Sequence, residues 1–544
     1  MYPLDEFVRE NHDRWSSGKP IRFALVSRSY RSVDRERGVK KQVFGSRFPP
    51  LGLLNIGAIL RADQALLRRL TEVRLFDEED CEGVDDLFEL INSWLEDWDG
   101  PTMIGATCYT ATLPELSRFL TRFEASQHLL VVGGPHIAVQ PNFETAHIAV
   151  RGEARLPIRH IVNTFATDLF FEQSSTDGIV YQRDEASSPV PARTSFDDSL
   201  ETIPSPAFDY SLSSSALDTF VTHVERSVSL HPQIYVCTQS CRARCSFCST
   251  YLIHGKSKSR PVDLIRQDLY ELVHHYGHDG FEFWDDDLLQ HKEIDELLKL
   301  LESLGKPWFC FGRSETIDEE VASKLARAGC KRIFLGIESM TQSRLDYFNK
   351  GTTVEQNRRA VLALDSFGIG AIAGFILGCP EDTVESMIAT YEEYLALPLL
   401  AVSTSILSPD PGTREFVRAK RRGGDFLQLL SGPTLGCFKP NLELFGAGFP
   451  AGIPTLCRNV SKDELNMMTD VFEAHFIVRE EIWEKFLLNL PSQHVGRLRA
   501  YFSYLLQRIE VKRRPSELPE VLDLQREVLS RPFAKMMRQY AEAL

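Results

Sequence analysis

Two runs of alternating strand and helix signals constrain the fold of this chain more than any other feature of its sequence. The first run occupies residues 21–166 and the second occupies residues 233–407. In both runs, short apolar segments with strand character precede longer segments whose apolar residues have helical spacing. This alternation predicts parallel sheets covered by helices, and the ligands of such sheets bind beyond the carboxyl ends of the strands.

The two runs divide the chain into five expected regions, because 544 residues exceed what a single core accommodates. These are a Rossmann-like domain at 20–170, a Ser- and Pro-rich linker at 171–231, a partial TIM barrel of six βα units at 232–410, a loop-rich connection at 411–460 and a helical C-terminal region at 461–544. A capping box of Ser461 and Glu464 is expected to open the last region. The predicted fold class is therefore α/β with a helical C-terminal region.

Eleven short segments are the expected strands. They are residues 21–27, 72–76, 102–107, 128–134 and 147–152 in the first run, and 233–237, 281–284, 307–312, 332–337, 371–378 and 399–407 in the second. The segments between them carry the helical patterns, including one at residues 51–67.

The charge balance limits the classes of partner. The chain carries 61 Lys and Arg against 76 Asp and Glu, a formal net charge of −15, whereas a protein that tracks nucleic acid needs a basic stripe. Residues 1–14 contain no apolar run typical of a secretion signal, and no later stretch reaches the roughly 20 apolar residues of a membrane helix. We therefore expect a soluble, cytoplasmic protein that binds neither nucleic acid nor membrane.

Three cysteines gather directly after the first strand of the second run, at Cys241, Cys245 and Cys248. Three thiolates on one tight loop can hold three irons of a cubane cluster and leave the fourth iron open. A zinc loop is the alternative, but structural zinc sites usually add a second, distant pair of cysteines, and none of the eleven cysteines supplies a second C-x-x-C segment. Cys237 lies inside the expected strand, where we expect a packed core thiol.

The spacing C-x3-C-x-aromatic-C resembles that of the radical SAM superfamily, and the resemblance continues along the barrel. It implies a [4Fe–4S] cluster on the three thiolates and S-adenosyl-L-methionine (SAM) at the open iron. The segments that carry it are FEFWDDDL at the second barrel strand, GIES at the fourth and GFILGCPE at the fifth. The SAM-binding residues implied by this resemblance are Phe247, Asp285, Asp286, Arg313, Glu338, Ser339, Gly374, Ile376 and Gly378.

The resemblance gives these residues different roles. Phe247 and the glycines of the fifth strand would lie near the adenine, since a glycine lets the backbone approach a ring closely. Asp285 or Asp286 would pair with the SAM ammonium group, and Glu338 would contact the ribose or the amino group. Arg313 would pair with the SAM carboxylate or form a structural salt bridge.

The first region resembles the cobalamin-binding domain found upstream of many radical SAM barrels. The matching segments are FPPLGLL, GATCYT, VVGGPH and VRGEA, in which Ala154 replaces a glycine. The cobalamin-binding residues implied by this resemblance are Pro50, Leu51, Gly52, Thr107, Tyr109, Gly133, Gly134, Pro135, His136, Gly152 and Glu153. For His136, a contact to the nucleotide tail or a place in the core is expected rather than a cobalt ligand.

One departure concerns the cobalt. The D-x-H-x-x-G motif, which supplies a histidine ligand, is missing, because residues 77–83 read DEEDCEG. Cobalamin bound without a protein ligand and a domain that binds no cobalamin both remain open.

The resemblance implies cleavage of SAM to methionine and a 5′-deoxyadenosyl radical, which abstracts hydrogen from an unactivated substrate carbon. The expected activity is cobalamin-dependent methylation of a small-molecule natural product, with an electron donor such as flavodoxin or ferredoxin. A non-methylating rearrangement or cyclisation, a peptide substrate, and a cobalamin or redox sensor without turnover remain alternatives. The basic residues at 414–422, within the segment 408–460, either border the substrate pocket or form a solvated basic helix, and we expect the helix.

Overall fold

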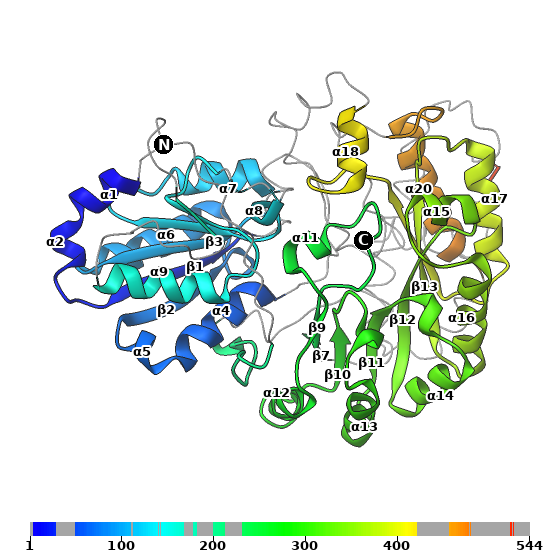
Figure 1. The fold of residues 1–544 in the computed structure, drawn as a ribbon, viewed down its shortest axis with the longest axis horizontal. Coiled ribbons are helices and arrows are strands. Elements are labelled where there is room, and N and C mark those ends of the chain that lie inside the picture. Colours follow the sequence, from blue (N-terminus) through cyan, green and yellow to red (C-terminus); the bar gives the residue numbers. More distant parts are fainter. Residues whose placement is uncertain are drawn as a thin grey trace, which may run out of the picture.

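The structure of the protein is a computed structural model. It describes residues 4–28, 49–109, 112–139, 141, 143–167, 178–181, 200–212, 231–421, 456–477, 479, 523, 524 and 526, without the side chains of residues 165–167. Two α/β units lie side by side, the first built from the N-terminal run and the second from the later run (Figure 1). The predicted α/β fold class is confirmed.

The first unit is a six-stranded sheet with the strand order β2-β1-β3-β4-β5-β6. The strands are β1 (Ile21–Ser27), β2 (Leu70–Asp77), β3 (Thr102–Thr107), β4 (Leu129–Gly133), β5 (Ile148–Val150) and β6 (Ile179–Tyr181). The surrounding helices are α4 (Leu51–Ala62), α5 (Gln64–Leu67), α6 (Val84–Glu96), α7 (Leu113–Leu120), α8 (Pro135–Val139) and α9 (Arg155–Thr167). The first five strands are parallel, so their carboxyl ends share one edge of the sheet.

The structure adds elements that the sequence pattern did not predict. Strand β6 pairs antiparallel with β5 and lies within the stretch expected to be linker. The helical pattern at residues 51–67 is divided into α4 and α5, because Asp63 adopts an extended conformation and its carboxylate caps the N–H groups of Ala65 and Leu66. Two short N-terminal helices, α1 (Leu4–Glu10) and α2 (His12–Trp15), also pack on this unit.

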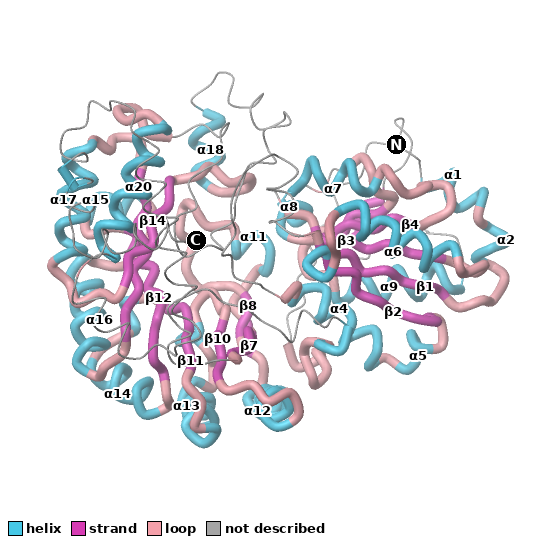
Figure 2. The backbone as a smooth tube through the Cα atoms, turned by 180° about the vertical axis from the view of Figure 1, so that it is seen from behind, coloured by secondary structure: helices cyan, strands magenta, loops and turns pink. Residues whose placement is uncertain are grey.

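The second unit is a partial barrel of six parallel strands in the order β14-β13-β12-β11-β10-β7. The strands are β7 (Pro232–Tyr235), β10 (Gly280–Phe283), β11 (Trp308–Gly312), β12 (Cys330–Glu338), β13 (Gly370–Leu377) and β14 (Ala401–Ile406). The helices are α12 (Val262–His274), α13 (Ile294–Leu304), α14 (Glu319–Arg327), α15 (Gln342–Tyr347), α16 (Val354–Ser366) and α17 (Val384–Leu395). Figure 2 shows helices such as α12, α13, α14 and α16 on the outer side of these strands.

A helix from the C-terminal region packs against the last barrel strand. Helix α20 (Lys462–Ile477) follows the predicted capping box, in which Ser461 and Glu464 exchange side-chain to backbone hydrogen bonds of 2.7 and 3.3 Å. The buried carboxylate of Glu473 accepts hydrogen bonds from the backbone N–H and the hydroxyl of Thr404 on β14. Among the described residues, no helix is both long and apolar enough to cross a membrane.

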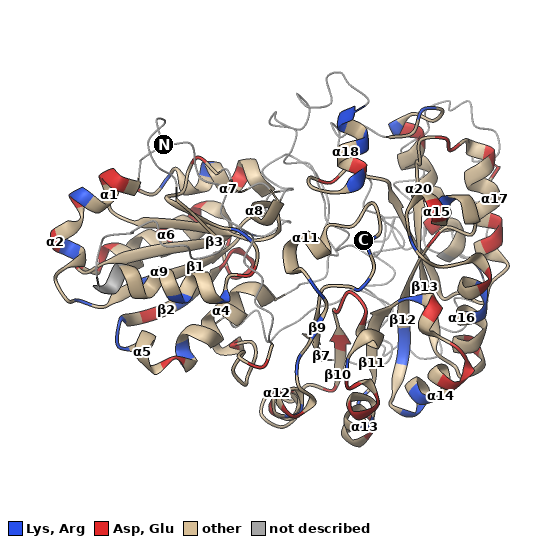
Figure 3. Ribbon diagram, in the orientation of Figure 1, with Lys and Arg blue, Asp and Glu red and all other residues tan. Residues whose placement is uncertain are grey.

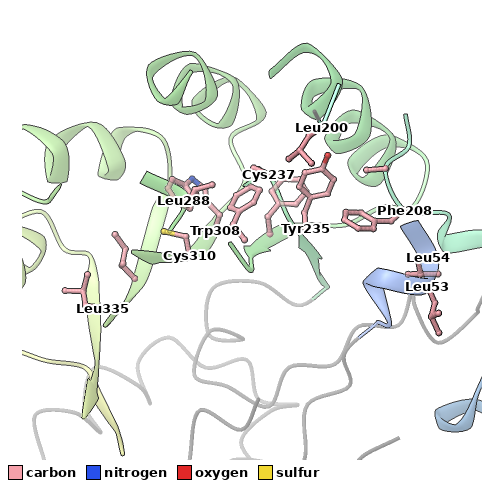
Figure 4. Packing of buried hydrophobic residues seen from close by; sticks show 14 of the residues in the cluster. Leu53, Leu54, Leu200, Phe208, Tyr235, Cys237, Leu288, Trp308, Cys310 and Leu335 are labelled. Atoms are coloured by element: carbon pink, nitrogen blue, oxygen red, sulfur yellow. The ribbon is translucent and has the colours of Figure 1, made fainter. Parts of the chain in front are cut away.

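Residues 200–212 join the two units through a shared core. Phe208 lies between Leu54 of α4 and Tyr235 of β7, and Leu200 lies beside Tyr235 in the same apolar cluster (Figure 4). The ring of Phe208 meets the ring of Tyr235 edge-on, with centroids 5.6 Å apart. This segment therefore belongs to the packed interior of the molecule.

A buried ion pair fixes the same segment to the barrel. Arg260 lies 3.1 Å from Asp268, and both side chains are 2% exposed. Arg260 also donates to the carbonyl oxygens of residues 200, 203 and 204, at 3.4, 2.9 and 2.8 Å. Asp268 accepts hydrogen bonds from Ser205 and Tyr235, each at 2.5 Å.

We predict that Asp268→Ala lowers the free energy of unfolding by about 3–5 kcal/mol, because it leaves the Arg260 charge buried without its partner. Denaturant unfolding measured by circular dichroism tests this. Glu296→Ala is the control, since it removes an ion pair with Lys299 that is exposed on both sides, and it should leave the unfolding midpoint unchanged. Equal midpoints for the two variants would contradict the prediction.

Candidate functional site

The three-cysteine loop lies at the carboxyl end of β7, between β8 (Thr238–Gln239) and α11 (Thr250–His254). Gln290 holds its first half, since the amide donates to Ser240 O at 2.6 Å and accepts from Arg242 N at 3.0 Å. The second half is tied to the loop after α15, because Ser246 N donates to Phe348 O at 2.7 Å. The backbone of the loop is thus held by the Gln290 side chain and by the backbone of the segment after α15.

The thiols of this loop face different surroundings. Cys245 is buried, whereas Cys241 and Cys248 are half-buried. Arg313 Nη1 lies 3.7 Å from Cys245 Sγ. Burial raises the pKa of Cys248 to about 11, so ligation there requires a metal centre that displaces the proton.

The loop does not form a site for a single ion. Within the described part of the chain, no three His, Cys, Asp or Glu side chains come together in a group that could hold one metal ion. Ligands of a cubane bind different irons and stand farther apart than ligands of one zinc ion. This arrangement fits the cluster better than zinc. Cys237 is fully buried, as expected of a core thiol.

The acidic segment after β10 contains three carboxylates with different surroundings. Asp285 Oδ1 accepts the backbone N–H groups of Cys237, at 3.0 Å, and of Thr238. Asp285 therefore ties the end of β7 to the end of β10, while its Oδ2 is buried without a hydrogen-bond partner among the described residues. Burial raises its pKa to about 7, although these hydrogen bonds act to lower it.

Asp287, which the sequence analysis did not single out, is placed to receive a cation. It is fully buried, and neither of its carboxylate oxygens has a hydrogen-bond partner among the described residues. Burial raises its pKa to about 6, partly offset by Arg242 and Arg313. A buried carboxylate without partners is costly unless a ligand supplies the hydrogen bonds. The sequence signal that could have identified Asp287 was its place in the run of three aspartates at 285–287.

Two predicted SAM contacts are engaged within the protein. Arg313 pairs with Glu315 at 2.5 Å and donates to Lys350 O at 2.5 Å, which matches the structural salt bridge left open as its alternative. Glu338 Oε1 lies 3.1 Å from Lys350 Nζ. Glu338 has a φ of 65°, a strained value for a residue with a side chain, and it aims its carboxylate between the glycines of neighbouring strands.

The remaining SAM candidates surround the same end of the barrel. A Cβ added at Gly374 would lie 3.1 Å from Glu338 Oε2, so the glycine makes room for that carboxylate. Ile376 belongs to a small apolar cluster against which Phe247 packs. Gly378 has a φ of 82°, typical of glycine, and its N–H donates to Asp382. Ser339 is fully buried and its hydroxyl accepts the N–H of Thr341, which makes it part of the turn.

A cavity of about 410 Å³ opens between the two units. It is lined by nine of the eleven cobalamin candidates, namely Leu51, Gly52, Thr107, Tyr109, Gly133, Gly134, Pro135, Gly152 and Glu153. The barrel contributes Trp284, His254 and Asp286 to the opposite wall. Pro50 and His136 do not line it. His136 is 2% exposed, and burial lowers its pKa to about 4, so it lies in the core.

Gly134 shapes the floor of this cavity. Its φ is 102°, and an added Cβ would lie 2.8 Å from Cys108 O and 2.9 Å from Thr107 Cγ2. The residue after β4 must therefore be a glycine for the chain to turn here. The glycine-lined strand ends fit a flat ligand of nucleotide size, as the resemblance implies.

A charged bridge crosses the cavity and was missed by sequence reasoning. Glu153 Oε1 lies 2.7 Å from His254 Nδ1, and Arg155 flanks the other oxygen at 3.4 Å. On the barrel side, Thr250 donates to Asp286 at 3.0 Å, and the Asp286 charge acts on His254. Burial alone would lower the pKa of His254, but Glu153 and Asp286 raise it above its ordinary value. No spacing rule links Glu153 and His254, which are 101 residues apart.

The comparison with known families decides the identity of the barrel. The profile of the radical SAM superfamily matches residues 235–394, which contain the cysteine loop and the four barrel strands β10, β11, β12 and β13. These residues form a radical SAM domain. This confirms the predicted family and, with it, the [4Fe–4S] cluster and SAM as cofactors.

Two relatives of this radical SAM protein extend the match beyond the barrel. An uncharacterized methyltransferase of Pyrococcus horikoshii is 27% identical over 386 residues, covering 69% of this chain and 79% of its own. Bacteriochlorophyllide d C-12(1)-methyltransferase of Chlorobaculum tepidum is 27% identical over 335 residues, covering 60% and 68%.

Solved structures show the same fold over most of the radical SAM protein. TsrM from Kitasatospora setae, with cobalamin and a [4Fe–4S] cluster bound, covers 94% of this chain and 99% of its own, with a TM-score of 0.59 at 13% identity. OxsB, with aqua-cobalamin and SAM bound, covers 98% and 81%, with a TM-score of 0.63 at 14% identity. Both units of the fold are therefore shared with these enzymes.

We predict that Gly134→Ala lowers stability by about 1–3 kcal/mol, because alanine cannot adopt this φ without strain and its Cβ meets backbone atoms. Denaturant unfolding and the amount of cobalamin retained after gel filtration measure the effect, and both should fall. Gly52→Ala is the control for the unfolding measurement, since its added Cβ meets no protein atom within 4 Å, and its unfolding should match that of the wild type. Normal unfolding and cobalamin retention in Gly134→Ala would contradict the prediction.

We also predict that the contribution of His254 to stability depends on pH. Because its folded-state pKa is raised above the ordinary value of about 6.5, the bridge stabilises fully below that value and is lost as pH rises through the raised pKa. The melting temperature of the wild type should exceed that of His254→Gln at pH 6, and the difference should shrink toward pH 9. His275→Gln, at an exposed position, is the control. A constant difference across this range would refute the idea.

Proposed function

We propose that this radical SAM protein is a cobalamin-dependent C-methyltransferase that acts on an unactivated carbon of a small molecule. The observation that carries the proposal is the shared cavity. The glycine-lined edge of the first sheet and the residues that follow the cysteine loop form opposite walls of one space, joined by Glu153 and His254. A reaction that uses two cofactors on one substrate requires such a joint space.

The relatives support methyl transfer and a small-molecule substrate. Two of them are bacteriochlorophyllide methyltransferases, and TsrM is a methyltransferase solved with its tryptophan substrate. These names concern those proteins. The matches cover 79% and 68% of the lengths of the first two relatives, so the similarity extends over both units.

The chain's residues have the following proposed tasks. Cys241, Cys245 and Cys248 hold the cluster, which with SAM supplies a 5′-deoxyadenosyl radical when bound. Asp287 receives the SAM ammonium group, since it offers a buried carboxylate without a partner. Gly374 and Ile376 border the adenine, and Glu338 is positioned by Lys350.

Cobalamin, which would supply the methyl group, is proposed to rest on the edge formed by Thr107, Gly133 and Gly134. Among the described residues, no histidine of this unit lines the cavity, since His136 lies in the core and residues 77–83 contain no histidine. Within the described part of the chain, His254 is the histidine that lines the cavity, and it lies against Glu153. We therefore propose binding without a histidine from the first unit.

A non-methylating reaction is the second candidate. An anaerobic magnesium-protoporphyrin IX monomethyl ester cyclase of Rubrivivax gelatinosus is 31% identical over 161 residues, although these cover only 28% of this chain. A methyltransferase forms S-adenosylhomocysteine together with 5′-deoxyadenosine during turnover, whereas a cyclase of this type forms no S-adenosylhomocysteine. The ratio of the two products, measured by mass spectrometry with cobalamin-loaded enzyme, separates the two candidates.

We predict that Cys245→Ala abolishes the broad visible absorbance of the cluster and reduces 5′-deoxyadenosine formation to background after anaerobic reconstitution, because two thiolates do not hold the cubane. Cys237→Ala is the matched control. Its thiol is buried beside the loop but is expected to ligate nothing, so iron content and 5′-deoxyadenosine formation should persist. Zinc in the anaerobically purified wild type, or undiminished cleavage in Cys245→Ala, would overturn the assignment.

A further inference from the structure

One exposed basic helix stands out on this acidic molecule. Helix α18 (Arg414–Arg421) carries four basic residues within eight positions (Figure 3). Arg414, Lys420 and Arg421 are exposed, and no described carboxylate forms an ion pair with any of them. Arg414, Val417 and Arg421 recur at helical spacing, so they share one face, and Val417 is 42% exposed on it.

This helix rests directly on the cysteine loop. Glu415 N donates to the carbonyl oxygen of Ser246, the residue that follows Cys245, at 3.2 Å. The buried Glu415 carboxylate accepts the hydroxyl of Tyr347 at 2.6 Å and pairs with Arg418 at 2.6 Å. The Arg418 guanidinium lies 4.4 Å from the centre of the Tyr347 ring. Glu415 and Arg418 thus anchor the helix, while the other three cations face outward.

From this placement we infer that α18 is the docking surface for a small acidic electron carrier of the flavodoxin type. The inference rests on the proposed function in one respect: that function requires an electron from an outside donor. The transfer moves one electron from the reduced flavin to the cluster, and no atom is transferred. Backbone contact between α18 and the loop beside Cys245 puts a partner docked there next to the electron's destination.

Charge complementarity selects this occupant. With a net charge of −15, the chain as a whole repels an acidic protein, so a productive encounter needs a local basic surface. Electron-transfer complexes are small and short-lived, and a patch the size of one helix face suits them. The exposed Val417 among the cations supplies an apolar contact of the kind found in such interfaces.

The experiment compares two reductants on one enzyme. Arg414→Glu/Lys420→Glu/Arg421→Glu and the wild type are reconstituted, and 5′-deoxyadenosine formation from SAM is measured with flavodoxin and its NADPH-dependent reductase or with dithionite. We expect the flavodoxin-driven rate to fall about tenfold or more at low ionic strength, while the dithionite-driven rate stays unchanged. The affinity of oxidised flavodoxin, measured by calorimetry, should fall in parallel.

The control reverses three exposed cations elsewhere on the barrel, as Arg327→Glu/Lys331→Glu/Arg359→Glu. These lie on α14, at the start of β12 and on α16, so they change net charge equally without touching α18. An equal loss of flavodoxin-driven rate in both triple variants, or none in the α18 variant, would overturn the docking surface.

A loss of the dithionite-driven rate in the α18 variant would mean that the substitutions disturb the cysteine loop. The salt dependence of the wild-type rates then tests the docking surface. The flavodoxin-driven rate should fall steeply with added NaCl while the dithionite-driven rate does not, and equal salt dependence overturns the inference. Failure of the proposed function itself is recognised separately, because the wild type would then release no 5′-deoxyadenosine with either reductant.

Discussion

The buried ion pair of Arg260 and Asp268 is the interaction on which the joint architecture depends. Two parallel sheets can each bind a ligand at the carboxyl ends of their strands, but a shared site forms only if those ends face each other. Arg260 and Asp268 hold residues 200–212 against the barrel, and the same residues pack on α4 of the first sheet. The charges are paired and surrounded by hydrogen-bond partners, which offsets their desolvation.

The carboxylates around the barrel mouth show how burial divides similar residues into different tasks. Asp285, with backbone partners, ties two strand ends together, whereas Asp287, two residues later, keeps both oxygens without partners among the described residues. Asp286 is enclosed by protein yet keeps accessible surface, because it lines the cavity beside His254. Three adjacent carboxylates therefore have different surroundings: backbone hydrogen bonds at Asp285, the cavity beside His254 at Asp286, and burial without a described partner at Asp287.

Much of the fold could be predicted from the sequence, because strands buried on both faces leave continuous apolar runs. The expected strand at residues 102–107 matches β3, and the capping box at Ser461 opens α20 as predicted. Strand β6 is three residues long and antiparallel, too short to leave such a run. The bridge of Glu153 and His254 joins residues 101 positions apart, and only the packing of the two units brings them together.

The backbone of Glu338 shows that the barrel mouth is not built for maximal stability. A residue with a side chain pays roughly 1–2 kcal/mol for a left-handed φ such as 65°. Glycine would relieve that strain, but it would remove the carboxylate that lies between Lys350 and the gap above Gly374. Stability alone would therefore favour glycine at this position, whereas the carboxylate requires glutamate. The strained backbone persists only while the neighbouring strands and Lys350 hold it.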